Sequence, residues 1–124
     1  MKLLVNLIGA IFILQTSCAQ ERAYDQTKVS SKIETSIDNT YRGIKSKTGI
    51  IYYVEKDNRT LTAYKNDKII WQTDIISVCG KPLVGSPEIR YIKLERNIIS
   101  VTFGKHSYAN VDINNGKTTF GAAD

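Results

Sequence analysis

The chain has few of the side chains that hold metal ions or act as catalytic nucleophiles. Its 124 residues include two cysteines, Cys18 and Cys79, and one histidine, His106. A structural zinc site takes about four cysteine, histidine or acidic ligands at characteristic spacings, and no such set is present. We therefore expect no metal and no cofactor. An enzyme of the cysteine–histidine type would have to pair Cys79 with His106.

Runs of like charge are also missing. The net charge is +5, but lysines and arginines are interspersed with acids along the chain, without the blocks of about five like charges that mark an interaction tail. A nucleic-acid-binding surface would need a basic stripe with aromatic platforms. The composition therefore predicts no nucleic-acid partner, and at most a weak, unspecific attraction to anionic lipid or cell-wall polymer.

No apolar stretch is long enough to cross a bilayer, which takes about 20 residues in a helix. The apolar run at residues 3–14 follows Lys2 and is interrupted by Asn6 and Gly9. A short positive start followed by a short apolar run is typical of a targeting segment that is removed on export. We therefore assign residues 1–18 to a signal peptide.

The end of this targeting segment, residues 14–18, reads Leu-Gln-Thr-Ser-Cys. It resembles the lipobox of bacterial lipoproteins, although Gln15 stands where that pattern has a leucine-like residue. The resemblance implies that Cys18 carries a lipid and that the protein is anchored in the bacterial cell envelope, in the periplasm or at the outer membrane. Two alternatives stay open. Cleavage after Ala19 would give a secreted protein, and an unlipidated Cys18 that stays in the chain could form a disulfide with Cys79 in that oxidising compartment.

Residues 19–48 are polar and hold few large apolar side chains. We interpret residues 20 to about 26 as a tether between the anchor and the folded domain, and place the start of the β domain at residue 49. Val29, Ile33 and Ile37 recur at a four-residue spacing, which fits a short amphipathic helix over residues 27–37. An edge strand or a disordered segment fits the same residues.

Residues 49–124 have the pattern of a β domain. Short stretches rich in isoleucine, valine, tyrosine and threonine are separated by polar turns such as Asn66-Asp67. In residues 98–103, Ile99, Val101 and Phe103 alternate with polar residues, as in a strand with one buried face. We therefore predict a small all-β domain, with about six to seven mostly antiparallel strands in a sandwich or half-open barrel.

Two segments of this domain are similar to each other. Residues 66–71 read NDKIIW and residues 115–120 read NGKTTF, each after a strand, a polar turn and a second strand. The spacing of about 48 residues lies within the range of β-propeller blades, and each tail resembles the blades of quinoprotein-type propellers. A propeller needs about four or more blades and this chain has two such segments, so a quinone site does not carry over.

Exposed aromatic and basic residues are the candidates for binding. Tyrosines on polar strand faces, next to lysine and arginine, are enriched in protein interfaces. Residues 75–88 form the longest connection in the domain and contain both prolines, and such loops often carry sites. The residues that we expect to contact a partner are Tyr64, Lys81, Arg90, His106 and Tyr108. Cys79 and Trp71 are expected to be structural residues.

Together these features predict a non-catalytic, envelope-anchored domain that binds a protein partner. One example would be an immunity-type inhibitor of a toxin that acts on the envelope, by analogy with other small anchored domains. The alternative is a structural or accessory lipoprotein that binds envelope polymer. The third candidate is an enzyme built on Cys79 and His106.

Overall fold

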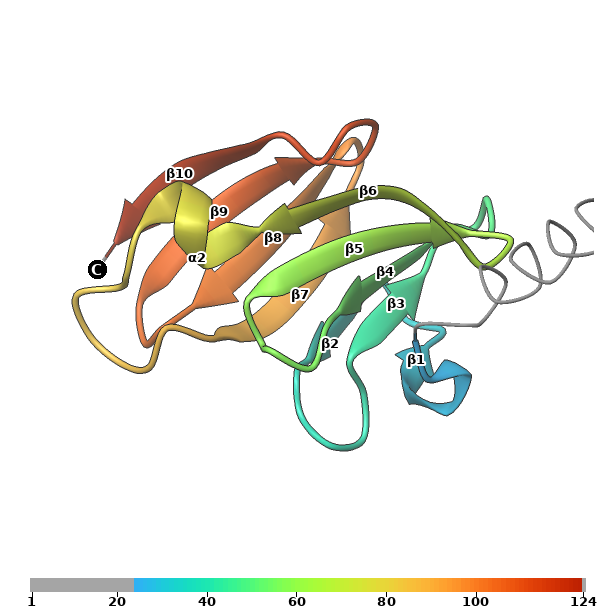
Figure 1. Cartoon of the computed structure of the whole chain (residues 1–124), viewed down its shortest axis with the longest axis horizontal. Coiled ribbons are helices and arrows are strands. Elements are labelled where there is room, and N and C mark those ends of the chain that lie inside the picture. The colour runs from blue at the N-terminus through green and yellow to red at the C-terminus, as the bar shows by residue number, and fades with distance from the viewer. Residues whose placement is uncertain (1–23, 124) are drawn as a thin grey trace, which may run out of the picture.

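Two stacked sheets of five strands each make up the domain (Figure 1). The computed structural model describes residues 24–123, so Cys18 and the rest of the predicted targeting segment lie outside the described residues. The first sheet has the order β1-β3-β4-β5-β6 and the second has the order β10-β9-β8-β7-β2. The pair β1–β3 is parallel, and the other described pairs are antiparallel. The predicted all-β sandwich is therefore confirmed.

The elements have the following bounds. The first sheet contains β1 (Val29–Ser30), β3 (Gly43–Lys45), β4 (Ile51–Val54), β5 (Thr60–Lys65) and β6 (Lys68–Asp74). The second contains β2 (Glu34–Ser36), β7 (Ile89–Glu95), β8 (Ile98–Phe103), β9 (Ser107–Asp112) and β10 (Thr118–Ala123). A 3₁₀ turn, η1 (Gln26–Lys28), precedes β1, and a short helix, α2 (Ile75–Cys79), follows β6. Within this described part of the chain, no helix has the length and apolar character needed to cross a membrane.

The domain begins earlier than the sequence predicts. Three of the ten strands, β1, β2 and β3, lie within residues 29–45, in the polar segment before the predicted β domain of residues 49–124. Of the alternatives for residues 27–37, the structure has the edge strand, since β1 pairs with β3 and β2 pairs with β7 at the sheet edges. Strands of two or three residues are too short to show a period of two, which explains the missed boundary and the low predicted strand number.

The main core lies between the two sheets. In β8 the predicted alternation is present, because Ile99, Val101 and Phe103 are buried there. The first sheet contributes inward side chains from four strands, namely Ile44, Tyr52, Val54, Leu61, Ala63 and Trp71. Burying each large apolar side chain contributes about 1.5–3 kcal/mol, so this layer stabilises the sandwich as one unit.

The segment after β6, which the sequence predicts to be a long connection, begins with the short helix α2. Asp74 caps its start, because its Oδ1 accepts a hydrogen bond of 3.0 Å from the backbone N–H of Ser77. Gly80 ends it in a left-handed conformation with φ of 87°. Ile75 and Ile76 are buried in the main core. These apolar residues therefore belong to a helix and not to a strand.

Candidate functional site

A tyrosine cluster covers the outer face of the first sheet. The ring of Tyr24 packs on those of Tyr64 and Tyr53, with centroids 4.6 Å and 5.7 Å away. Tyr64 is only 2% exposed, and its hydroxyl donates a hydrogen bond of 2.7 Å to Oε2 of Glu55. Burial, reinforced by this bond, raises the pKa of Tyr64. The expectation that Tyr64 faces a partner is therefore wrong, because the segment before β1 folds over it.

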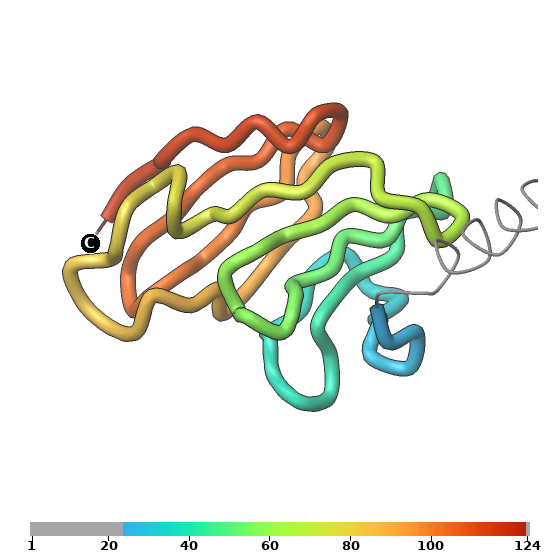
Figure 2. Tube along the Cα trace, viewed as in Figure 1, coloured from blue at the N-terminus to red at the C-terminus, as the bar shows by residue number. Residues whose placement is uncertain are grey.

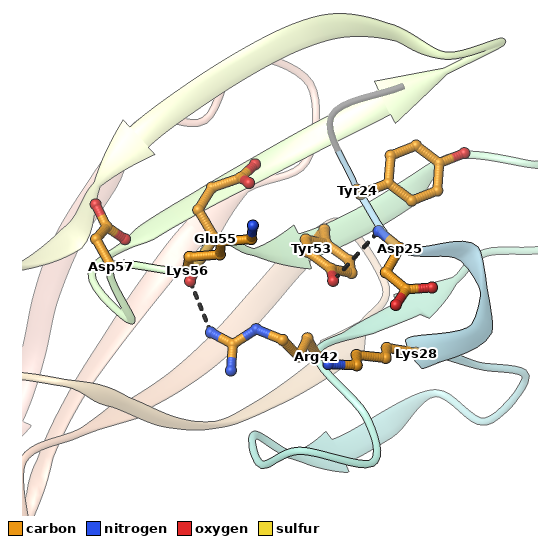
Figure 3. A pocket seen from close by; sticks show the side chains of 8 residues that line it. All are labelled: Tyr24, Asp25, Lys28, Arg42, Tyr53, Glu55, Lys56 and Asp57. Carbon is orange, nitrogen blue, oxygen red and sulfur yellow. Dashed lines mark hydrogen bonds between the residues drawn. The ribbon is translucent and has the colours of Figure 1, made fainter. Parts of the chain in front are cut away.

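A hollow of about 720 Å³ lies beside this cluster (Figure 3). Its charged lining is balanced, with three acids and three bases next to Tyr24 and Tyr53. These charged residues are Asp25, Lys28, Arg42, Glu55, Lys56 and Asp57. The hollow therefore offers no net charge to a ligand.

The polar groups of this hollow are bonded to the fold itself. The guanidinium of Arg42 donates to the backbone carbonyls of Val54 and Glu55, at 3.1 Å and 2.6 Å. Asp25 accepts from both the hydroxyl and the backbone N–H of Thr27, and these bonds hold its pKa below the ordinary value. An ionised, hydrogen-bonded carboxylate is a poor general acid near neutral pH. We therefore interpret the hollow as a structural junction.

A more prominent site lies at the end of the second sheet, where the loop of residues 80–88 rests on the β8–β9 turn. The backbone N–H of Lys105 donates to the carbonyl of Val84 at 2.8 Å, and that of Gly104 donates to the carbonyl of Glu88 at 3.0 Å. Arg90 adds a bond of 3.3 Å from its guanidinium to the carbonyl of Gly104. The loop is thus held to the turn at its middle and at its C-terminal end. We call this loop, together with the turn, the tip.

Two glycines allow the close contact within the tip. Gly85 has φ of 90°, and a Cβ there would lie 2.6 Å from the backbone nitrogen of Lys105. Gly104 has φ of 60°, and its Cβ would lie 2.4 Å from Cβ of Pro82. Real Cβ atoms do not approach other atoms so closely, and side chains rarely adopt these φ values. Only glycine fits either position without moving the loop.

The tip exposes apolar side chains among basic ones. Leu83 is 93% exposed and Val84 is 49% exposed. Three basic side chains near them are also exposed: Lys81 in the loop, Lys105 in the turn and Arg90 in β7. Adjacent exposed apolar side chains with a polar rim are the kind of feature that marks an interaction site.

The structure brings together three of the five predicted contact residues. Lys81 lies in the loop, Arg90 bonds to the turn, and His106 lies in the turn. Tyr108 follows at the start of β9 and is half-buried on the outer face of the second sheet, opposite Thr102 and Ala122. Sequence reasoning missed Leu83, although an apolar Leu-Val pair between Pro82 and Gly85 is a readable signal.

The two structural candidates lie outside the tip, although Cys79 directly precedes its loop. Trp71 is 7% exposed in the main core. Cys79 is half-buried at the end of α2, and burial raises the pKa of its thiol. A raised pKa lowers the thiolate fraction and so works against a nucleophilic role. In residues 24–123, no three histidine, cysteine or acidic side chains lie close enough together to hold a metal ion.

Comparison of the chain with protein-family models, curated proteins and solved structures found no match.

The two similar segments of the sequence lie in corresponding places of the sandwich. Residues 66–71 lead into β6 and residues 115–120 lead into β10, which are edge strands of the two sheets.

Proposed function

We propose that this chain is a non-catalytic binding domain, anchored to a bacterial envelope through Cys18, that captures a protein partner with its tip. The observation that carries this proposal is the 93% exposure of Leu83 on a loop held by backbone hydrogen bonds. A loop whose backbone is already held loses little backbone conformational freedom on binding, which favours affinity.

The chemistry of the tip indicates what the partner offers. An apolar pocket would receive Leu83, and acidic side chains around that pocket would meet Lys81 and Lys105. Charge pairs at the rim mainly raise the association rate and the specificity, while the central apolar contact supplies most of the affinity. An inhibitor that blocks an envelope-acting toxin is one function of this kind.

The other two candidate functions have weaker support. Polymer binding would use the outer face of the second sheet, where Tyr91 and Tyr108 both pair with Thr102 of β8. The hydroxyl of Tyr91 is already bonded to Glu34, and this bond raises the pKa of Tyr91 to about 12. Catalysis by Cys79 and His106 is disfavoured by the raised pKa of the thiol.

Site-directed photocrosslinking of the full chain in its native cells tests the proposal. A photoreactive residue in place of Leu83 should give one discrete crosslinked protein. The same residue in place of Tyr41, which is 41% exposed between β2 and β3, should not. Leu83→Ala should then weaken co-purification of that protein by about tenfold or more, the loss typical of a central apolar contact. Crosslinks from the face around Tyr108 to polymer, with none from position 83, would contradict the proposal.

A further inference from the structure

Four exposed lysines lie together at one end of the first sheet. Lys45 and Lys47 belong to the end of β3 and the β3–β4 turn, and Lys65 and Lys68 flank the β5–β6 turn. The pairing brings these turns to the same end, because Ile51 pairs with Lys45 on one side and with Tyr64 on the other. We call this part of the molecule the lysine end.

The lysine end has little opposing charge and two exposed apolar side chains. The acid within these two turns is Asp67, which accepts a hydrogen bond of 3.1 Å from the hydroxyl of Tyr24. Ile69 and Ile70 are 53% and 46% exposed, next to Lys68. They lie where the register shifts, so that Ile70 has no partner residue on β5. Lysines around exposed apolar side chains are typical of surfaces that lie on anionic bilayers.

The N-terminal part of the chain joins the fold at this same place. Tyr24 is the first described residue and its hydroxyl is bonded within the β5–β6 turn. Six residue steps separate it from Cys18, and an extended chain spans at most about 3.5 Å per residue, or about 20 Å here. A lipid on Cys18 would therefore keep Tyr24 close to the bilayer.

We propose that the lysine end lies on the anionic phospholipid headgroups of the bilayer that holds the Cys18 lipid. This inference rests on the anchor in the proposed function and adds an orientation to it. The α2–β7 loop and the β5–β6 turn lie at opposite ends of the long axis (Figures 1 and 2). With the lysine end on the headgroups, the tip points away from the membrane, toward a partner.

Amine acetylation of the full chain, purified from native membranes, tests this orientation. The protein is placed in vesicles of phosphatidylcholine alone or of phosphatidylcholine mixed with phosphatidylglycerol. We expect Lys47 and Lys68 to react more slowly, by about threefold or more, in the anionic vesicles, and high salt to abolish the difference. Lys81 and Lys105 at the tip should react equally in both.

Two double variants complete the test. Lys47→Gln with Lys68→Gln should remove the protection of Lys45 and Lys65, whereas Lys81→Gln with Lys105→Gln should keep it and weaken only the partner crosslink. Equal reactivity of Lys47 and Lys68 in both vesicles, for a chain whose intact mass includes the lipid, would overturn the orientation alone. An intact mass without a lipid would overturn the anchor and the orientation together, while the crosslink from position 83 still tests the tip.

Discussion

Nε1 of Trp71 donates a hydrogen bond of 2.8 Å to the backbone carbonyl of Ile113, and this bond joins β6 of the first sheet to the end of β9 in the second. Trp71→Phe keeps an aromatic ring but leaves the carbonyl without this donor. We expect the free energy of unfolding to fall by about 2 kcal/mol, from the lost bond and the smaller ring. Urea unfolding measures this loss. Tyr41→Phe, at a site 41% exposed, is the control, and equal midpoints for the two variants would contradict a bridging role.

Gly85 and Gly80 provide a matched pair at the tip. Both have φ near 90°, but a Cβ on Gly85 would collide with the backbone of Lys105, whereas a Cβ on Gly80 meets nothing within 4 Å. Either alanine variant therefore carries backbone strain of about 1–3 kcal/mol. Gly85→Ala alone should move the loop off the turn.

Amide hydrogen exchange reports that movement. The N–H of Lys105 donates to the carbonyl of Val84, so Gly85→Ala should speed its exchange by about tenfold or more. Gly80→Ala should leave that rate unchanged, and it should leave the position-83 crosslink intact. Similar exchange in both variants would show that the loop tolerates the added methyl group.

The parts of the fold that follow one simple period could be predicted from the sequence. In β8 and β9 the buried residues alternate with exposed or half-buried ones, and the Asn66-Asp67 turn has the positive φ values that a tight hairpin needs. In β7 the buried residues do not alternate strictly with exposed ones. A strict alternation would put Ile89 and Tyr91 on one face, but a register shift between them places Ile89, Ile92 and Leu94 toward the core. Such a bulge leaves no simple mark in the sequence.

The candidate site could be predicted only in part. The loop stands out through its prolines and its length, but the support of the β8–β9 turn depends on a contact between segments far apart in the chain. Tyr64 was misjudged for the same reason, because the ring that covers it comes from Tyr24. For a strand with polar residues on one face, the sequence pattern predicts that this face is exposed, because the pattern does not show which segment covers it.

Tyr24 should hold the segment before β1 on the fold. Tyr24→Ala removes the ring contacts with Tyr53 and Tyr64 and the bond to Asp67. We expect a loss of about 2–3 kcal/mol in the free energy of unfolding, together with faster tryptic cleavage after Lys28. Tyr41→Ala removes a tyrosine that is 41% exposed and should change neither. Unchanged cleavage in Tyr24→Ala would show that other contacts hold the segment.

Acid should weaken the fold through Asp57. Burial alone would raise its pKa, but hydrogen bonds from the backbone N–H groups of Arg59 and Thr60 and from the Thr60 hydroxyl hold it below the ordinary value. A lowered native pKa means that the stabilisation is present above the unfolded pKa of about 4 and is lost as pH falls below it.

The pH dependence of urea unfolding checks this sign. Asp57→Asn keeps a side-chain oxygen that can accept hydrogen bonds, but the side chain cannot ionise. The free energy of unfolding of this variant should therefore fall less between about pH 5 and pH 3 than that of the wild type. Asp57→Ala should be less stable at every pH, because the turn also loses its acceptor. An identical acid slope for the wild type and Asp57→Asn would contradict the role of the charge.

The thiol of Cys79 should react slowly in the folded chain. Burial raises its pKa, and the thiolate is the reactive form. We expect disulfide-exchange labelling of Cys79, followed by peptide mapping at neutral pH, to be slower by about tenfold than in urea. His106→Ala should leave this rate unchanged. Fast labelling that is lost in His106→Ala would favour the cysteine–histidine enzyme over the binding domain.

The shortness of β1 has a mechanical consequence. A pull on the anchor would reach the fold through Tyr24 and then through two residue pairs, Val29 with Gly43 and Ser30 with Ile44. Peeling residues 24–30 away would lengthen the attachment by about 25 Å, while the main core cluster, to which none of these residues belongs, would bear no load. The fold could therefore extend toward the pull while the core between the two sheets stays intact.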